Sequence, residues 1–195
     1  MSQRAERPIR GMLSAFLLAR AASHLRKGGI IAYPTEGVYG LGCNPLDPAA
    51  IRRIMALKGR STAKGFILIA ADFAQIEPFL VCQDPLLVER VLPSWPGPVT
   101  WVVPAAPWVP AWLRGKRSGL AVRVTAHPVA AALCRWFGGP LVSTSANRSG
   151  RPPARNVLAV RKHFRTKDVM LIAGHTGGAV GPTAIFDALS GKRLR

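Results

Sequence analysis

Apolar residues recur along the chain at two spacings, one typical of helices and one typical of buried strands. A helical repeat over residues 13–25 is followed by two glycines, which commonly end helices. Asp47 and Pro48 form an N-cap and first-turn pair, and the helix that they predict ends at Lys58. Further helices are expected over residues 85–92, 127–137 and 156–164.

Short apolar runs alternate with these helices and predict strands at residues 30–33, 66–71, 99–103, 120–124, 141–144 and 169–173. The glycine-spaced residues 37–42 are expected to form a loop that lies close to another segment. Residues 95–112, which contain five prolines, are expected to form a strand flanked by loops. Some neighbouring strands leave no room for a crossover helix between them. Residues 1–195 are therefore predicted to form a single α/β (α+β) domain, a twisted mixed β-sheet with flanking helices.

The composition is typical of a globular protein with an ordinary hydrophobic core. Hydrophobic residues make up 49% of the 195 residues and charged residues 18%, so the chain can bury an ordinary core. No run of about twenty apolar residues is present, and we expect no transmembrane span. The first apolar segment fits a helix face better than a cleaved targeting signal. Three widely spaced cysteines without metal-ligand or CxxC spacing favour a reducing, cytoplasmic compartment.

The charge of the chain is strongly unbalanced. Lys and Arg number 27 and Asp and Glu number 9, which gives a net charge of +18. No acidic residue occurs between Glu89 and Asp168, although that stretch is rich in Lys and Arg. The natural partners of such a chain are anions.

The common catalytic motifs are absent from the sequence. It contains no GxxxxGK[ST] phosphate loop, no GxGxxG, no HExxH and no GxSxG. Because the nine acidic residues are scattered, a pair of catalytic carboxylates or a protein-held metal centre has little support. The chemistry must therefore rest on other residues.

Two clusters of polar and basic residues occur in the first third of the chain. Thr35 and Glu36 follow a predicted strand, and alone they are better explained by a simple turn. Lys58 and Arg60, with Lys64, follow a predicted helix, and in an extended backbone residues 58 and 60 project to one side and can bind one polyanion. The alternative is a pair of cations at a helix end that face water.

Two more clusters occur in the second half of the chain. Residues 141–147 begin as an apolar strand and end in hydroxyl and amide side chains, among them Ser143, Ser145 and Asn147. Such groups bind phosphate oxygens or an amino acid without a repelling charge, and a Ser/Thr cap explains only one or two of them. Arg123 is the one charge in an apolar strand. Because few carboxylates are available inside the protein, an anionic ligand is its favoured partner.

Together, these clusters predict a basic, hydroxyl-rich concavity at strand ends that holds a polyphosphate and a second small anion. None of them supplies an activated nucleophile. The site suits a reaction in which the protein aligns two anions and neutralises developing phosphoryl charge, while a substrate supplies the attacking group. Nucleotidyl transfer is such a reaction.

Five motifs occur in a specific order: YPTE at residues 33–36, KxR at 58–60, WPGPVT at 95–100, AVRV at 121–124 and STSANxSG at 143–150. In these motifs the chain resembles the threonylcarbamoyl-AMP synthases of the YrdC-like family, in their short bacterial form called TsaC. The resemblance covers nearly the whole chain and implies a YrdC-like fold. It also implies a nucleotidyltransferase that converts L-threonine, bicarbonate and ATP to L-threonylcarbamoyladenylate and pyrophosphate.

The resemblance implies two groups of site residues. Those implied at ATP are Lys58, Arg60, Ser145 and Asn147. Those implied around threonine are Thr35, Arg123, Ser143 and Thr183. Lys58 and Arg60 are implied to be catalytic at the phosphates, and Arg123 is implied to bind the threonine carboxylate. Mg²⁺ is the implied cofactor, held mainly by the ATP phosphates, and the product is implied to pass to a separate threonylcarbamoyl transferase complex that modifies tRNA.

The main rival function is that of a non-catalytic protein that binds double-stranded RNA or tRNA on a basic concave face. The net charge of +18 supports this alternative. The hydroxyl and amide clusters, however, exceed what binding to an RNA backbone requires. A third alternative is carbamoyl or acyl transfer to another acceptor. Pyrophosphate release that depends on threonine separates the three.

Overall fold

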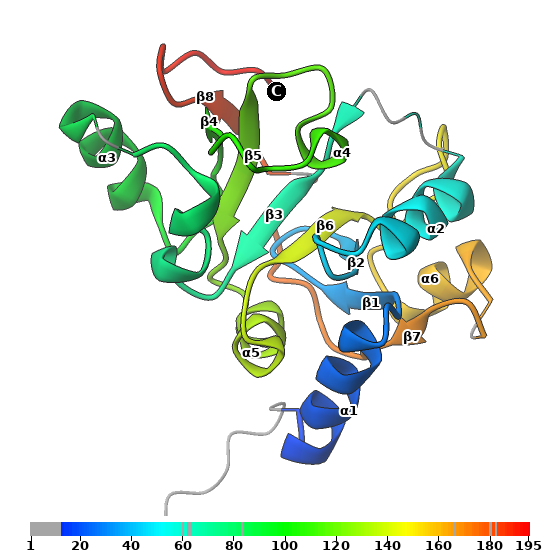
Figure 1. Cartoon of the computed structure of the whole chain (residues 1–195). Helices are drawn as coiled ribbons and strands as arrows, with labels where there is room; N and C mark the ends of the chain where they lie inside the picture. Colours follow the sequence, from blue (N-terminus) through cyan, green and yellow to red (C-terminus); the bar gives the residue numbers. More distant parts are fainter. Residues whose placement is uncertain are drawn as a thin grey trace, which may run out of the picture.

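The computed structural model describes residues 13–59, 61, 64–82, 84–165, 167–179, 181 and 183–195. Within them, eight strands form one twisted sheet in the order β7-β1-β2-β6-β3-β5-β4-β8 (Figure 1). The strands are β1 (Ile31–Pro34), β2 (Tyr39–Gly42), β3 (Ile67–Ala70), β4 (Thr100–Pro104), β5 (Gly119–Val124), β6 (Leu141–Ser145), β7 (Met170–Leu171) and β8 (Ile185–Asp187). The helices are α1 (Ala15–Arg26), α2 (Pro48–Lys58), α3 (Pro85–Val91), α4 (Ala111–Arg114), α5 (Pro128–Phe137) and α6 (Val157–His163).

The sheet mixes parallel and antiparallel pairs. Parallel pairs join β1 to β7, β3 to β5 and β4 to β8. Antiparallel pairs join β1 to β2, β2 to β6, β6 to β3 and β5 to β4. The predicted α/β fold with a mixed sheet and flanking helices is confirmed.

Helix α2 begins and ends where its sequence predicts. The Asp47 side chain accepts hydrogen bonds from the backbone N–H groups of Ala49 and Ala50, which have no partner within the helix. At the other end, Gly59 has a left-handed backbone with φ of 60°, a conformation that favours glycine. This turn makes Lys58 the last residue of the helix.

One face of the sheet carries the larger core. Leu68, Val122 and Val142 point to this face from the central strands, and α2 and α3 pack against it through residues such as Ile54 and Leu87. Because side chains alternate along a strand, the neighbouring residues on these strands point to the opposite face. The place of a residue in this alternation therefore decides which face of the sheet its side chain reaches.

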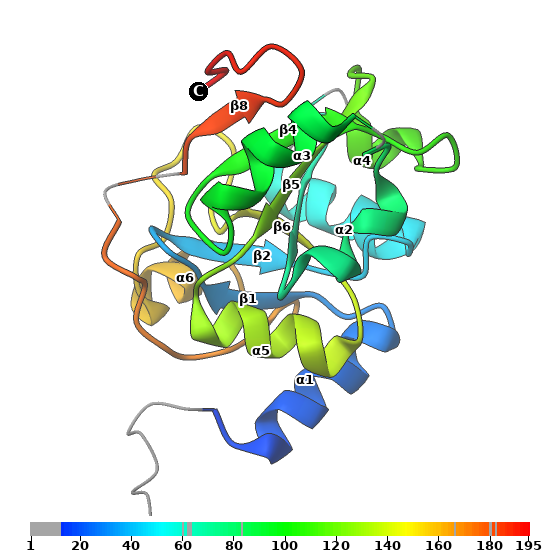
Figure 2. The same cartoon turned by 90° about the vertical axis from the view of Figure 1, so that its left-hand side faces the viewer.

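The second face is covered over only part of its area. Helices α1 and α5 lie side by side and cover one part of it (Figure 2), where Ile31, Ile69 and Leu141 join a second apolar cluster. Beyond this cluster, the same face of β5 and β6 carries Arg123 and Ser143. The strand register pairs Ile69 with Arg123 and Ile67 with Ser143, so these polar residues continue the row of apolar ones. This uncovered part of the face, which carries polar side chains, can hold a ligand-binding site.

The structure differs from the sequence prediction at residues 37–42. We expected a loop, but Tyr39–Gly42 forms β2, which pairs with β1 and β6. The glycines of this strand allow close contact: a Cβ atom on Gly42 would lie 2.7 Å from both a ring carbon of Tyr33 and the carbonyl oxygen of Val142. Strand β8 and helix α4 were also not predicted. None of the helices in the described part of the chain has the length and apolar character needed to span a membrane.

Candidate active site

A cavity of about 530 Å³ opens over the uncovered part of the second sheet face. This volume is typical of sites for small ligands. Its polar and charged lining residues are Thr35, Lys64, Arg117, Arg123, Ser143, Thr144, Ser145, Thr183 and Arg195. Five residues predicted for the site, Thr35, Arg123, Ser143, Ser145 and Thr183, thus line one cavity, although they lie far apart in sequence.

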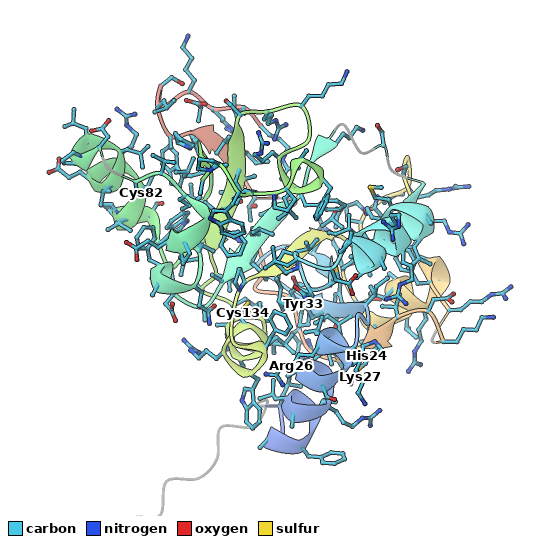
Figure 3. All side chains as sticks on the ribbon, in the orientation of Figure 1. His24, Arg26, Lys27, Tyr33, Cys82 and Cys134 are labelled. Carbon is cyan, nitrogen blue, oxygen red and sulfur yellow. The ribbon has the colours of Figure 1, made fainter. Side chains whose placement is uncertain are left out.

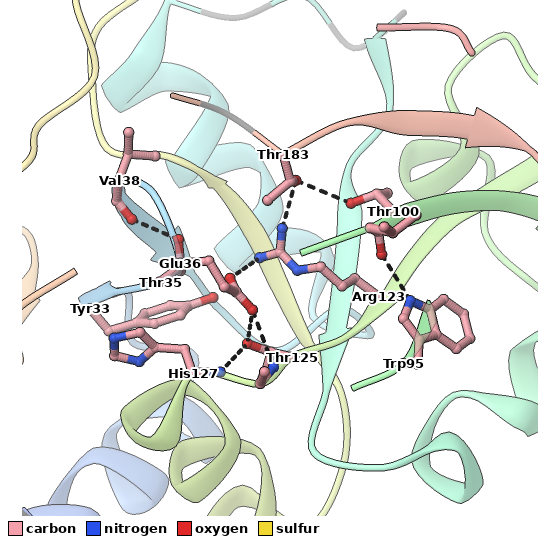
Figure 4. A network of polar contacts seen from close by, with 12 residues as sticks. Tyr33, Thr35, Glu36, Val38, Trp95, Thr100, Arg123, Thr125, His127 and Thr183 are labelled. Atoms are coloured by element: carbon pink, nitrogen blue, oxygen red, sulfur yellow. Dashed lines mark hydrogen bonds and ion pairs between the residues drawn. The ribbon is translucent and has the colours of Figure 1, made fainter. Parts of the chain in front are cut away.

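Arg123 is buried in the wall of this cavity, with 4% of its surface exposed. Its Nη1 donates a hydrogen bond to Oγ1 of Thr183 at 2.7 Å, and its Nη2 lies 3.1 Å from Oε2 of Glu36 (Figure 4). We favoured an anionic ligand as the partner of Arg123 because few carboxylates are available, but the structure also gives it a protein carboxylate, that of Glu36. The turn after β1 brings Glu36 to β5, a contact between residues that are distant in sequence.

Glu36 is itself held by the start of the segment that leads into α5. Its Oε1 accepts hydrogen bonds from Oγ1 of Thr125 at 2.6 Å and from the backbone N–H of Ala126 at 3.2 Å. The backbone N–H of His127 donates to the same threonine hydroxyl at 3.2 Å. These contacts fix the carboxylate behind the guanidinium. The simple turn that we considered for Thr35 and Glu36 does not account for them.

The hydroxyl groups at the centre of the cavity depend on a glycine. Thr35 Oγ1 donates to the carbonyl oxygen of Val38 at 2.7 Å. A Cβ atom on Gly40 would lie 3.2 Å from Ser143 Oγ and 3.4 Å from Cγ2 of Thr35, which is tight packing. Glycine at this position of β2 therefore leaves room for both side chains.

The floor below these hydroxyls is apolar and buried. Tyr33 and Cys134 lie close together in the interior between the sheet and α5 (Figure 3). Burial raises the pKa of the Tyr33 hydroxyl well above its ordinary value and raises that of the Cys134 thiol to about 12. Both groups remain protonated near neutral pH, and neither lines the described part of the cavity.

Lys58 lies behind the cavity wall. Only 3% of its surface is exposed, and its Nζ donates to the carbonyl oxygens of Ser145 and Asn147, the latter at 2.8 Å. The alternative of a helix-end cation that faces water is therefore wrong for Lys58. The expected extended backbone is also wrong at this position, because Lys58 is the last residue of α2. Arg60 lies outside the described residues.

Asn147 belongs to the same group of contacts. Its Oδ1 accepts a hydrogen bond from Ser145 Oγ at 2.6 Å and lies 3.4 Å from Nζ of Lys58. Its Nδ2 donates to the carbonyl oxygens of Arg148 and Arg151 at 3.0 and 2.5 Å. Asn147 does not line the described cavity, whereas Ser145 does. Lys58 and Asn147 thus hold the end of β6, where Ser145 lies, and the turn that follows it.

Cations surround the open side of the cavity. Lys64, Arg117 and Arg195 line it together with Arg123. Partial burial and the neighbouring guanidinium groups of Arg123 and Arg117 lower the pKa of Arg195. Among the described residues, the pair of Arg123 and Glu36 is the one salt bridge, so the other cations are not balanced by protein carboxylates. The cavity is therefore suited to anions.

The sequence analysis did not assign every residue of this site. Arg195 and Thr100 were missed: Thr100 Oγ1 lies 3.3 Å from Thr183 Oγ1, and its only signal was a place in the WPGPVT motif. Glu36 stood in a quoted motif but received no role. Lys64 was grouped with Lys58 and Arg60 as a candidate for binding a polyanion, and Arg117 belongs to the basic stretch without acidic residues, but nothing placed either residue beside Arg123.

No group of three His, Cys, Asp or Glu side chains suited to a metal ion occurs among the described residues. The carboxylate of Glu36 already faces Arg123. The described side chains therefore do not form a cradle for a divalent cation. A cation that accompanies a polyphosphate would have to be held mainly by the phosphate oxygens.

Comparison with known proteins places the chain in a family. The Sua5/YciO/YrdC family model, described as "Telomere recombination", matches residues 23–195. A threonylcarbamoyl-AMP synthase of Methylococcus capsulatus is 54% identical over 185 residues, which cover 95% of this chain and 100% of the relative. A threonylcarbamoyl-AMP synthase of Nitrosococcus oceani is 57% identical over 175 residues, which cover 90% of this chain and 95% of the relative.

A solved structure of a longer relative shares the fold. The crystal structure of P. abyssi Sua5 complexed with L-threonine matches with a TM-score of 0.83 and 33% identity, over 90% of this chain and 52% of that chain. This chain thus corresponds to about half of that Sua5 chain. On the family match and on the identity to these relatives, the chain belongs to the Sua5/YciO/YrdC family.

Proposed function

We propose that the chain is a threonylcarbamoyl-AMP synthase, a nucleotidyltransferase that makes L-threonylcarbamoyladenylate and pyrophosphate from L-threonine, bicarbonate and ATP. The observation that carries this proposal is one cavity that combines hydroxyl groups, a buried arginine and unbalanced cations on its rim. Curated relatives of nearly the same length bear the same enzyme name. This match favours catalysis over the alternative of a non-catalytic RNA-binding protein.

The proposed reaction needs no protein nucleophile. Bicarbonate takes up a proton and loses water to give carbon dioxide. The threonine amine forms an N–C bond to this carbon dioxide and loses a proton, which gives a carbamate. A carbamate oxygen then bonds to the α-phosphorus of ATP, the bond from that phosphorus to the bridging oxygen breaks, and pyrophosphate leaves. The described cysteines do not line the cavity, and burial raises the pKa of Cys43 and Cys134 to about 12, so their thiolates are not available.

In this proposal, one set of cavity side chains binds threonine and another binds ATP. Arg123 binds the threonine carboxylate, and the hydroxyls of Thr35, Ser143 and Thr183 lie around the rest of the amino acid. Ser145, held by Lys58 and Asn147, faces the nucleotide, and the rim cations Lys64, Arg117 and Arg195 stabilise phosphate charge. Arg60 is proposed at the phosphates on the family motif alone. The protein contributes alignment and electrostatic stabilisation.

Mg²⁺ enters the proposal as part of MgATP. The described side chains do not fit a protein-held metal site, so no step of the mechanism is assigned to such a site. Magnesium bound to ATP neutralises part of the phosphate charge as pyrophosphate leaves.

The further partners are also part of the proposal. The product is a mixed anhydride that must be consumed by a transferase complex, and we propose that this complex modifies tRNA in the cytoplasm. Direct contact with tRNA is proposed on the excess of basic residues, because exposed Lys and Arg bind phosphodiester backbones.

The test is the nucleotide product formed from ATP and bicarbonate with each amino acid in turn. We expect pyrophosphate release that requires both threonine and bicarbonate, together with an adenylate product that mass spectrometry identifies. Hydrolysis of ATP to ADP and phosphate as the main reaction would show that the adenylation mechanism is wrong. Equal rates with all amino acids would reject threonine as the substrate.

A further inference from the structure

Glu36 is a carboxylate that stands directly behind a cation of the cavity. Its Oε2 lies 3.1 Å from Nη2 of Arg123, and both side chains are buried. Arg123 lines the cavity, whereas Glu36 is not among the described residues that do so. Glu36 therefore acts on a ligand only through its charge and through Arg123.

The ion pair leaves most of the donors of Arg123 unused. Guanidinium carries five N–H groups. Among the described residues, Arg123 donates one hydrogen bond, from Nη1 to Thr183, and its buried Nε has no partner. Oε2 of Glu36 lies at ion-pair distance from Nη2 but accepts no hydrogen bond within the described residues. Glu36 thus balances the charge of the guanidinium without occupying its directional donors.

An ion pair with only a structural role would be expected to satisfy its buried donors, because an unpaired buried N–H is costly. Here the carboxylate is anchored at its other oxygen by Thr125 and Ala126, and the guanidinium remains short of acceptors. The arrangement suits a ligand that brings acceptor atoms but little charge. A carboxylate with one negative charge and two oxygens is such a ligand.

The other cations of the cavity have no such neighbour. Lys64, Arg117 and Arg195 line the same cavity, and none of them pairs with a carboxylate in the described chain. Phosphate groups with two or more charges are attracted to these residues. Glu36, behind Arg123, therefore makes the Arg123 end of this basic cavity a place where high negative charge is disfavoured.

We propose that Glu36 determines the specificity of the Arg123 subsite: it admits a monoanionic carboxylate and excludes phosphate and pyrophosphate. The inference rests on the proposed function, in which ATP and pyrophosphate occupy the same cavity as an amino acid. With an effective dielectric constant of about 20, an extra negative charge about 6 Å from the Glu36 carboxylate is disfavoured by about two orders of magnitude. Because the cavity is open to water, which screens charge, we expect a selectivity of at least about tenfold.

The decisive variant is Glu36→Gln, which keeps the size of the side chain and removes its charge. Its matched control is Glu89→Gln, an exposed position on α3. Calorimetric titration with inorganic pyrophosphate and with L-threonine, each without ATP, gives the ratio of the two affinities. We expect this ratio to shift about tenfold toward pyrophosphate in Glu36→Gln and to stay unchanged in the control. An unchanged ratio in a folded Glu36→Gln protein would overturn the proposal.

A measurement on the unmodified protein tests the same proposal if Glu36→Gln does not fold. Inhibition of the synthase reaction by pyrophosphate is measured at several threonine concentrations. Exclusion from the Arg123 subsite predicts that pyrophosphate does not compete with threonine. Competition between the two in the unmodified protein would overturn the proposal. If the unmodified protein releases no pyrophosphate, the proposed function fails, and the calorimetric ratio still tests the role of Glu36.

Discussion

Replacement of Lys58 by methionine tests how the wall of the cavity is built. Met keeps most of the apolar stem and removes the ammonium group, so packing is largely retained. The change leaves the carbonyl oxygens of Ser145 and Asn147 without the donor that Nζ provides. Since Lys58 is only 3% exposed, water does not readily replace that donor.

The magnitude follows from these contacts. A hydrogen bond from a charged donor contributes about 1.5 to 3 kcal/mol. Lys58→Met loses those to the carbonyl oxygens of Ser145 and Asn147, and also the longer one to Oδ1 of Asn147. The desolvation cost of the buried ammonium disappears at the same time and offsets part of this loss. We expect the free energy of unfolding to fall by about 3 kcal/mol, which lowers Tm by about 6 to 12 °C in a protein of this size.

The activity of Lys58→Met should fall with its stability. The lysine holds the end of β6, where Ser145 lies, and a displacement of about 1 Å at a reacting group can cost about 10² in rate. The assay is threonine-dependent pyrophosphate release at a temperature well below Tm, with circular dichroism to confirm folding. We expect kcat to fall by about 10², and Lys58→Arg to restore it only in part because a planar guanidinium does not fit the space of an ammonium.

Lys64→Met is the matched control, because Lys64 follows Lys58 closely in sequence but is exposed and lines the cavity. Its stability should change by less than about 0.5 kcal/mol, while its KM for ATP rises. The reasoning would be refuted by a Lys58→Met protein whose Tm and kcat both stay near those of the unmodified protein. Equal losses of stability in the two variants would also contradict the assigned positions.

Three further predictions concern other parts of the molecule. Arg123→Ala should raise the KM for threonine far more than the KM for ATP, because truncating one partner of a buried charged contact costs about 2 to 5 kcal/mol. The assay is steady-state kinetics with each substrate varied in turn. Equal increases of the two KM values would show that the assignment is wrong. Burial raises the pKa of Cys134 from 9.0 to about 12, so the stability that this protonated thiol contributes is present below pH 9 and is lost as the pH rises toward 12. Cys134→Ala should therefore flatten the fall of unfolding free energy above pH 9 by up to about 1.4 kcal/mol per pH unit, and an unchanged slope would contradict this. Charge reversal on and after α6 should lower affinity for tRNA and reduce its salt dependence while adenylate synthesis continues; loss of synthesis in a folded variant would mean that the site lies on that face. The residues to reverse are the exposed Arg161, Lys162 and Arg165.

Five of the six α-helices of the described chain, all except α4, and most strands could be predicted because their signals are local. The N-cap residue Asp47 and the glycine that ends the helix, Gly59, each form hydrogen bonds with the adjacent turn of α2. Both residue types can be recognised in the sequence. Strand β2 was missed because its alternate residues are Gly40 and Gly42, so no polar and apolar alternation marks it. Its glycines are explained only by Tyr33 and Val142, which the sheet brings beside them.

Part of the site could be predicted because some of its residues also have local signals in the sequence. Polar residues at the ends of apolar strands, such as Ser143 and Arg123, stand out in the sequence and line the cavity. The partner of Arg123 could not be found this way, because Glu36 approaches it only through the turn between β1 and β2. A scarcity of acidic residues in the sequence says nothing about where the few that exist are placed.

The register of the sheet connects the fold to the site. On β6, Val142 faces the larger core, whereas Leu141 and Ser143 face the other side, one under α5 and the other in the cavity. A shift of β6 by one residue would turn Ser143 into the core and Val142 into the cavity, which would cost burial of apolar surface and bury an unsatisfied hydroxyl. On β5, the same shift would place the charge of Arg123 in the core. The apolar residues that stabilise the sheet therefore also fix which polar side chains reach the ligand.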